Sequence, residues 1–368
     1  MREERSVILP TGRLDVGITR AEAPIDAFCG FAARKNPKRG FLFVSKLLGK
    51  HVPVSAERMA KTHAELAERI PKDLPGPVLF VAMAETAIAL GLGVAFAWKE
   101  KNRRNDVLAI HTTRHPLAAP IAIDFKEEHC HAPSQFLHEP LPEHRERFAA
   151  ARSVILVDDE TSTGRTFSNL FKAIDSILPS VERRVAAVLT DWRGSDFATA
   201  TFETASLLEG NWNFSPTPEA RRIPMPSAEG IIGKKYDVDP GWGRRGLIAE
   251  PDVENFLRDV PFAKKLLILG TGEFSYPPFL LARVAERKGI ETFVQSTTRS
   301  PAMLGGAIED ALSFRDNYGD GIANHLYNPF TAERDAVLLC SETDEPSMDR
   351  TLVAALEATT LVMRTGIA

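Results

Sequence analysis

The sequence predicts an α/β protein with two doubly wound, mostly parallel sheets. Short apolar runs rich in β-branched residues alternate with amphipathic stretches over most of the chain, which is the pattern of strand–helix–strand units. The stretch from Asn211 to Arg245 interrupts this alternation, because it is rich in Pro, Gly, Trp and basic residues and shows little periodicity. The order of motifs before this stretch reappears after it, so we expect two α/β units.

Length and composition limit the number of domains and the class of protein to expect. With 368 residues the chain is long enough for two domains, and we expect a first domain over 1–212, a linker or wrapping segment over 213–250 and a second domain over 251–368. Hydrophobic residues make up 44% and charged residues 26% of the chain, as in ordinary soluble globular proteins. The net charge of −4 gives no reason to expect nucleic acid as a partner.

Three features of the sequence bear on the compartment. No apolar run reaches the roughly 18 residues that a membrane-spanning helix needs. The start, Met1 to Arg5, lacks the apolar region of a secretory signal. The three cysteines, at positions 29, 130 and 340, suggest neither a disulfide framework nor a zinc site. We therefore expect a cytoplasmic protein that has no membrane partner.

The elements of the first unit can be followed in order. A β-rich start leads into a basic stretch around Asn36, and the strands and helices after it are predicted at 41–44, 56–70, 78–81, 87–96, 107–110, 154–157, 167–178 and 185–189. The helix after residue 166 is the best supported. Its apolar side chains recur at helical spacing and Pro179 ends it.

The stretch from Val154 to Thr166 is the most informative in the chain. A buried strand ends in the carboxylates Asp158 and Asp159, and a Ser/Thr/Gly loop follows before the helix. Ligands of open α/β sheets bind at the carboxyl ends of strands. Backbone N–H groups at the start of a helix favour phosphate. We expect the carboxylates to accept hydrogen bonds from sugar hydroxyls and the loop to hold a phosphate through Ser162, Thr163, Gly164, Arg165 and Thr166.

This order of strand, acid pair, Thr-Gly-x-Thr loop and helix resembles the phosphoribosyl-pyrophosphate (PRPP) motif of the type I phosphoribosyltransferase family. The resemblance implies Mg²⁺-dependent transfer of a 5-phosphoribosyl group from PRPP to a base or base-like nitrogen of a small-molecule acceptor, with release of pyrophosphate. It also implies that the metal bridges pyrophosphate and ribose hydroxyls, so Asp158 and Asp159 would act on it indirectly. Glu160, Thr161 and Ser162, also predicted to contact substrate, depart from the family pattern. Because Ser162 stands where purine enzymes commonly carry an Asp, a standard purine acceptor is not implied.

Further residues are expected at the pyrophosphate end of the site. The resemblance places its pyrophosphate loop at Ala84, Glu85 and Thr86, which offer backbone N–H groups but no cation. Glu85 would repel pyrophosphate unless it is turned away or bridged by Mg²⁺. Arg114 is the first choice for a catalytic cation that stabilises charge on the leaving group. Weaker alternatives lie in two basic runs, around Arg39 and over 99–104.

The segment Glu127 to His131 carries two histidines two residues apart. His129 and His131 could contact the acceptor or serve as a general base, could bind metal with a third ligand from elsewhere, or could be structural. Cys340, at a predicted strand end, could be a nucleophile or a small buried apolar residue.

The second half of the chain repeats the motif order of the first. A strand over 266–269 runs into Glu273, a helix follows, and a strand from Val294 ends in Thr297, Thr298 and Arg299, much as Glu85 is followed by Thr112, Thr113 and Arg114. We hypothesise a diverged phosphoribosyltransferase-like copy with a degraded donor loop, because Cys340 and Ser341 replace the acid pair. Many enzymes of the family dimerise, and a neighbouring subunit lends residues to the active site. The chain could form such a homodimer, or the second copy could play the neighbour as an intramolecular pseudo-dimer.

The string Ser296 to Pro301 is similar to the signature of the TRSP domain, which occurs behind a phosphoribosyltransferase domain in gene clusters associated with tellurite resistance. The resemblance implies a role in nucleotide-like metabolite biosynthesis or stress resistance. Arg299 within the string could bind an anion. Two other functions stay open: a non-catalytic PRPP or nucleotide sensor that regulates a protein partner, and the reverse reaction, which would salvage a modified nucleotide.

Overall fold

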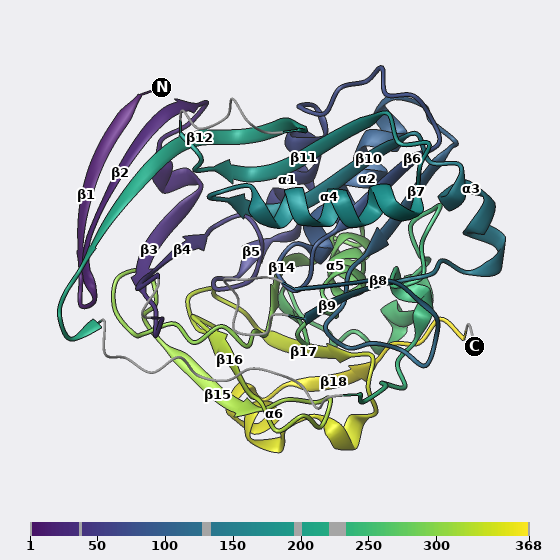
Figure 1. Ribbon diagram of the computed structural model, residues 1–368. Coiled ribbons are helices and arrows are strands. Elements are labelled where there is room, and N and C mark those ends of the chain that lie inside the picture. Colours follow the sequence, from purple (N-terminus) through teal and green to yellow (C-terminus); the bar gives the residue numbers. More distant parts are fainter. Residues whose placement is uncertain (1, 37–38, 127–133, 195–200, 221–232, 367–368) are drawn as a thin grey trace.

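The computed structural model describes residues 2–36, 39–126, 134–194, 201–220 and 233–366, which form two α/β units packed side by side (Figure 1). The histidines predicted at 129 and 131 lie outside the described residues. No helix in the described part of the chain is long and apolar enough to cross a membrane.

The first unit is built on a seven-stranded sheet. Its strands follow the order β1 (Glu3–Leu9), β2 (Gly12–Ala21), β12 (Glu203–Pro216), β11 (Arg183–Asp191), β10 (Ser153–Thr161), β6 (Val78–Ala82) and β7 (Val107–His111). The five strands from β12 to β7 are parallel, whereas β1 and β2 are antiparallel to their neighbours. The parallel strands β6 and β7 are buried along their whole length, which explains their continuous apolar runs.

Helices cover both faces of this sheet. Alternate residues of β6 point to opposite sides, so that Phe80 packs in one core with α1 (Ala56–Ala67) and α2 (Ile88–Lys101), while Leu79 packs in another with α4 (Arg165–Ile177). The predicted strand at 154–157 is longer than expected, because β10 continues pairing with β11 as far as Thr161. The acid pair therefore lies within the last residues of a strand, and the loop before α4 is only three residues long.

The second unit has a five-stranded sheet with the order β18 (Thr359–Val362), β17 (Ala336–Ser341), β13 (Lys265–Gly270), β14 (Glu291–Ser296) and β5 (Val54–Ser55). The first four strands are parallel. The short strand β5 comes from the N-terminal part of the chain and pairs antiparallel with β14. Helices α5 (Tyr276–Arg287) and α6 (Arg350–Leu356) pack on opposite faces of this sheet.

The central strands of the two sheets follow one topology. The order β11-β10-β6-β7 in the first sheet corresponds to β18-β17-β13-β14 in the second, with α2 and α5 at equivalent places in the chain. Each unit also has a two-stranded antiparallel hairpin between the second and third of these strands along the chain. In the first unit, β8 (Ile121–Lys126) and β9 (Ser134–His138) lie between β7 and β10. In the second unit, β15 (Ala311–Arg315) and β16 (Ala323–Tyr327) lie between β14 and β17. The second residue after β7 and the second residue after β14 bridge to the hairpin of their own unit, Thr113 to Phe136 and Thr298 to His325.

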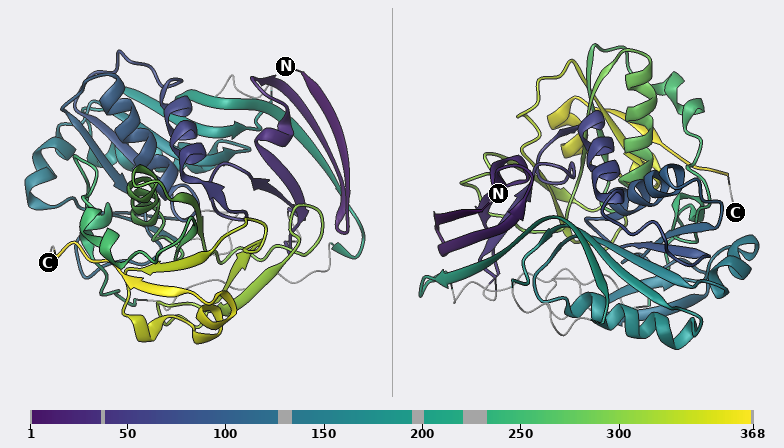
Figure 2. Two further views of the ribbon diagram at one scale, coloured as in Figure 1. Left: turned by 180° about the vertical axis from the view of Figure 1, so that it is seen from behind. Right: turned by 90° about the horizontal axis from the view of Figure 1, so that it is seen from above.

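The two units share a continuous core. Helices α2 and α5 lie against each other (Figure 2), and the rings of Phe96 and Tyr276 stack with centroids 6.4 Å apart. On the other side of the first unit, the hairpin of β3 (Cys29–Ala33) and β4 (Phe41–Ser45) packs on the long strand β12 through Phe41 and Trp212, whose ring centroids are 4.8 Å apart. This hairpin brings Arg39, from the basic stretch, to Glu160 near the end of β10.

Candidate active site

The loop between β10 and α4 has the geometry of an anion site. Gly164 occupies the N-cap position of α4 with a φ of +72°, a left-handed conformation that a side chain would disfavour. The hydroxyl of Thr163 accepts the Arg165 N–H at 3.3 Å. The loop thus turns sharply into α4, whose N-terminus has no side-chain cap hydrogen bond. Free N–H groups at the start of a helix, together with its dipole, favour an anion.

The acid pair lies beside this loop and is joined by a third carboxylate. The N–H of Asp159 donates to Oδ1 of Asp158 at 2.9 Å. Glu160 is held by Arg39, whose Nη1 and Nη2 donate to its two carboxylate oxygens at 2.5 and 3.0 Å. Burial, together with the charge of Glu160, raises the pKa of Asp159 to about 6. Asp159 therefore changes its charge near neutral pH.

The loop after β6 carries its carboxylate in a buried ion pair. Oε1 of Glu85 lies 2.7 Å from Nζ of Lys50, and Oε2 lies 3.8 Å from Nη1 of Arg114. Burial raises the pKa of the Glu85 carboxyl, but Lys50, Arg114 and Arg299 outweigh this effect and lower the pKa to about 2. The acidic side chain that would repel pyrophosphate is thus neutralised by cations.

The neighbours of Glu85 in this loop have different surroundings. The peptide bond between Ala84 and Glu85 is cis. The Ala84 N–H donates to the hydroxyl of Thr112 at 2.9 Å, and the Ala84 carbonyl accepts from Gln135 at 3.0 Å. Ala84 is therefore part of the wall behind the site, whereas Thr86 lines the site itself.

Most of the predicted residues meet in one cavity of about 450 Å³. The cavity is lined by Asp158 to Thr166 from the end of β10 and the start of α4, by Glu85 and Thr86, and by Arg114 and Arg299. Sequence reasoning did not select several other lining residues, among them Arg34, Asn36, Phe43, His51, Trp212 and Ser300. Arg34 and Asn36 had a signal in the basic stretch, and Ser300 had one in the string from Ser296 to Pro301. Phe43, His51 and Trp212 had none, because they reach the cavity through long-range packing.

The second unit contributes directly to this cavity. Thr298, Arg299 and Ser300 follow β14 and line the same cavity as the acid pair. Nη2 of Arg299 lies 3.2 Å from Oδ2 of Asp320 and also contacts the ring of His115. The arginine is 6% exposed, so its place is fixed by buried partners.

The equivalent place in the second unit is filled by side chains. Arg244, from the segment between the units, pairs with both carboxylate oxygens of Glu342 at 2.6 and 2.7 Å and lies 3.3 Å from Glu273. The hydroxyl of Tyr318 donates to Glu342 at 2.6 Å. Cys340 is fully buried in β17, and burial raises the pKa of its thiol, which disfavours the thiolate that a nucleophile needs.

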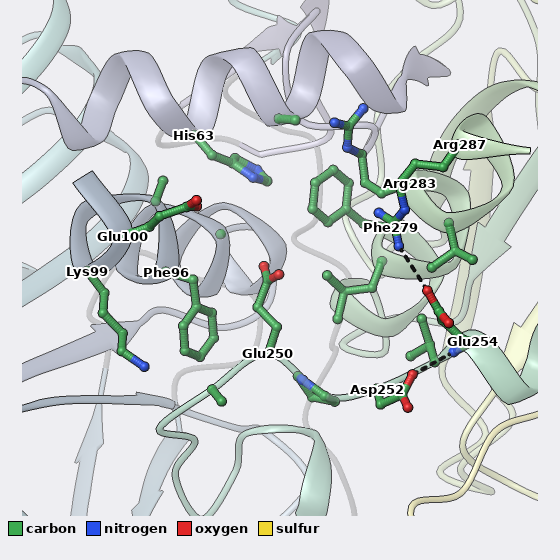
Figure 3. A pocket seen from close by; sticks show the side chains of 18 of the residues that line it. His63, Phe96, Lys99, Glu100, Glu250, Asp252, Glu254, Phe279, Arg283 and Arg287 are labelled. Carbon is green, nitrogen blue, oxygen red and sulfur yellow. Dashed lines mark hydrogen bonds and ion pairs between the residues drawn. The ribbon is translucent and has the colours of Figure 1, made fainter. Parts of the chain in front are cut away.

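A larger cavity of about 970 Å³ lies between α1, α2, α5 and residues 249–254 (Figure 3). It is next to the C-terminal half of α2, away from the strand ends that carry the acid pair. Lys99, Arg103 and Arg104 of the basic run over 99–104 line this cavity and not the one beside the acid pair, so the structure does not bring that weaker alternative to the predicted site. Its charged side chains pair locally: Arg287 with Glu254 at 3.5 Å, and Glu250 with the Tyr276 hydroxyl at 2.7 Å. The acid pair, Glu85, Arg114 and Arg299 all line the smaller cavity, which is therefore the candidate site.

Comparison with known proteins gives two family matches along the chain. Residues 28–211 match the phosphoribosyl transferase family model, and residues 248–356 match the TRSP domain, described as C-terminal to that transferase domain. No curated protein matches the chain.

Solved structures similar to the chain cover about half of it. They include the adenine phosphoribosyltransferase of Rhodothermus marinus, with 14% identity over 50% of this chain and 94% of that chain and a TM-score of 0.33. The Trypanosoma brucei adenine phosphoribosyltransferase in complex with AMP, pyrophosphate and ribose-5-phosphate has 13% identity, 56% and 87% coverage and a TM-score of 0.35. Orotate phosphoribosyltransferase from Aeropyrum pernix has 15% identity, 46% and 79% coverage and a TM-score of 0.28.

Proposed function

Because the chain belongs to the phosphoribosyltransferase family and carries a TRSP domain behind the transferase domain, we propose that it transfers a 5-phosphoribosyl group from PRPP to a nitrogen of a small-molecule acceptor and releases pyrophosphate. The observation that carries this proposal is the convergence of the acid pair, the loop before α4, Glu85, Arg114 and Arg299 in one cavity.

Each part of the donor has a matching part of the cavity. The N–H groups of the loop from Ser162 to Thr166 would hold the 5′-phosphate, and Asp158 and Asp159 would accept hydrogen bonds from the ribose hydroxyls. The pyrophosphate would lie near Thr86 between Arg114 and Arg299. Charge that builds up on the leaving group as its bond to the anomeric carbon breaks would be stabilised there by both arginines.

The residues of the cavity also fit the Mg²⁺ that the family commonly uses. Asp158 and Asp159 follow one another at the strand end, and the pKa of Asp159 is raised first by burial and then by the charge of Glu160. Among the described residues no cluster of three His, Cys, Asp or Glu side chains could hold a metal directly, which fits a metal held through the donor's hydroxyls. Asp158 and Asp159 would hold Mg²⁺ indirectly, through the ribose hydroxyls that they bind, and its charge would offset part of theirs. When bound, it would neutralise charge on the pyrophosphate.

We further propose that the TRSP domain is a diverged copy of the transferase domain. The shared strand order and the equivalent bridges of Thr113 and Thr298 support this origin. Its lost donor site is filled by Arg244, while its Arg299 reaches the cavity of the first domain. The second domain would then act as the lending partner of an intramolecular pseudo-dimer, with domains over 1–212 and 251–368 joined by 213–250.

The acceptor would bind between the acid pair and the hairpin of β3 and β4. Phe43 and Trp212 line this side of the cavity, and the guanidinium of Arg39 lies 5.7 and 5.9 Å from their ring centroids while it holds Glu160. Aromatic walls with a polar edge suit a planar, base-like ring. We keep His129 and His131 as proposed acceptor contacts.

Pyrophosphate release tests this proposal against the alternative of a non-catalytic sensor. The purified chain is incubated with PRPP, Mg²⁺ and a protein-free small-molecule extract of bacterial cells, and pyrophosphate is measured with and without the extract. Transfer predicts release that depends on the extract and disappears in Asp158→Asn/Asp159→Asn. If the chain binds PRPP but releases no pyrophosphate when the extract is present, the result would favour the sensor.

A further inference from the structure

The backbone that carries Arg114 is held by a carboxylate of the TRSP domain. The N–H of Arg114 donates to Oε1 of Glu273 at 2.6 Å, and the hydroxyl of Thr113 donates to Oε2 of the same carboxylate at 2.5 Å. Glu273 follows β13, at the place in the second unit that Glu85 takes after β6 in the first. One side chain thus bonds to two consecutive residues that lie about 160 positions earlier in the chain.

Glu273 is fixed and charged where it makes these bonds. It is 2% exposed, and its carboxylate lies 3.4 Å from Nδ1 of His115 and 3.3 Å from Nη2 of Arg244. Burial alone would raise the pKa of this carboxyl, but His115, Arg244 and the Thr113 hydroxyl reverse the effect, so that its pKa lies well below the ordinary value. Hydrogen bonds to such a carboxylate are stronger than those between neutral groups.

We propose that Glu273 is a positioning residue for pyrophosphate binding, which sets the Arg114 side chain at the pyrophosphate end of the transferase cavity. The inference rests on the proposed function, since it takes pyrophosphate as the ligand at that end. Glu273 stands where the second domain would have its own pyrophosphate loop, and it instead supports Arg114 of the first domain.

The long side chain of Arg114 explains why its backbone has to be held in place. The guanidinium reaches to within 3.8 Å of Glu85 at the end of a long, flexible side chain. A small shift of its backbone would move the charge by a comparable distance, and electrostatic stabilisation depends on preorganised placement. Two bonds from one buried carboxylate restrain both the Thr113 side chain and the Arg114 N–H, so the direction in which Arg114 leaves the backbone is defined by the TRSP domain.

The test compares three probes with the full-length chain: Mg²⁺-PRPP, Mg²⁺-pyrophosphate and ribose 5-phosphate, each titrated calorimetrically. Glu273→Gln keeps the shape of the side chain and removes its charge. We expect it to weaken binding of PRPP and pyrophosphate by about 10- to 100-fold, with ribose 5-phosphate changed less than about 2-fold. The matched control is Glu342→Gln, in the same buried network but bonded to Arg244 and Tyr318 rather than to Arg114; it should leave all three affinities near the wild-type values.

Several outcomes would overturn the inference. Unchanged pyrophosphate affinity in Glu273→Gln would do so, as would an equal loss for ribose 5-phosphate or the same selective loss in Glu342→Gln. If Glu273→Gln does not fold, Thr113→Val, which removes one of the two bonds, carries the test with the same expectation of a selective loss. Wild-type binding of ribose 5-phosphate and pyrophosphate without turnover would reject only the transfer reaction, whereas no binding of pyrophosphate or PRPP would reject both proposals.

Discussion

Lys50 and Glu85 form a buried ion pair that ties the proposed pyrophosphate loop of the transferase domain to the backbone of the TRSP domain. Nζ of Lys50 lies 2.7 Å from Glu85 and donates to the carbonyl oxygens of Thr297 at 2.7 Å and Gly272 at 3.3 Å. Both charged side chains are less than 5% exposed. The pair explains how Glu85 can lie in a loop proposed to bind pyrophosphate, because Lys50, at the interface of the domains, balances its negative charge.

Removing the cation of this pair should be costly. Lys50→Met leaves the Glu85 carboxylate buried without its nearest partner, and we expect the free energy of unfolding to fall by about 3–5 kcal/mol. Lys50→Met/Glu85→Gln removes both charges of the pair and should recover part of that loss. Denaturant unfolding of the two variants measures the difference. A loss below about 1 kcal/mol in Lys50→Met would show that the pair is not a structural link.

The affinity for Mg²⁺-PRPP should depend on pH through Asp159. Its pKa is raised to about 6, and only the ionised carboxylate accepts hydrogen bonds with both oxygens. We expect affinity to rise as pH increases through about 6 and to level off above 7, with about tenfold weaker binding at pH 5. Asp159→Asn should remove this rise. Calorimetric titrations between pH 5 and 8 provide the measurement, and a flat wild-type profile would speak against an Asp159 contact.

Two neighbours should move this pH profile in opposite directions. The charge of Glu160 raises the pKa of Asp159 and that of Arg39 lowers it. Glu160→Gln should therefore shift the midpoint below pH 6, and Arg39→Met should shift it above. The two variants are controls for each other, because both break the same ion pair. If both variants shift the midpoint in the same direction, the loss of the Arg39–Glu160 ion pair controls binding, and the charge near Asp159 does not.

The sharp turn before α4 should be sensitive to a single methyl group. Gly164→Ala places a side chain at a φ of +72°, which costs about 1–2 kcal/mol, and it should weaken ribose 5-phosphate binding about tenfold or more through the displaced N–H groups. Gly289→Ala is the matched control, because Gly289 also has a positive φ, of +87°, with open space around it and lies outside the cavity. Similar losses of affinity in both variants would contradict a phosphate role for the loop.

Local sequence pattern was sufficient for the central elements of the fold. The strand, the acid pair and the loop that begins α4 are consecutive residues, and their type and spacing were enough to predict their order. The end of the strand at Thr161 was not predicted, because it depends on pairing with β11. The repeated order of strands and of Thr-Thr-Arg segments also allowed the prediction of a second, similar α/β unit.

Contacts between distant segments could not be predicted in this way. The two-residue strand β5 joins the second sheet although it lies in the first third of the chain, and it is too short to show a periodic pattern. Lys50 and Arg244 have no neighbours in sequence that indicate a buried charge, and their roles appear only when carbonyls and carboxylates from both domains surround them. Arg39 stood in a basic stretch, but nothing there indicated Glu160 as its partner.

The donor site is the central claim, and calorimetric binding of Mg²⁺-PRPP to the wild type and to Asp158→Asn/Asp159→Asn tests it most directly. The account predicts measurable binding by the wild type and none by the double variant, because two charge-assisted contacts contribute roughly 3–6 kcal/mol. A wild type that does not bind PRPP, or a double variant that binds it equally well, would contradict the account.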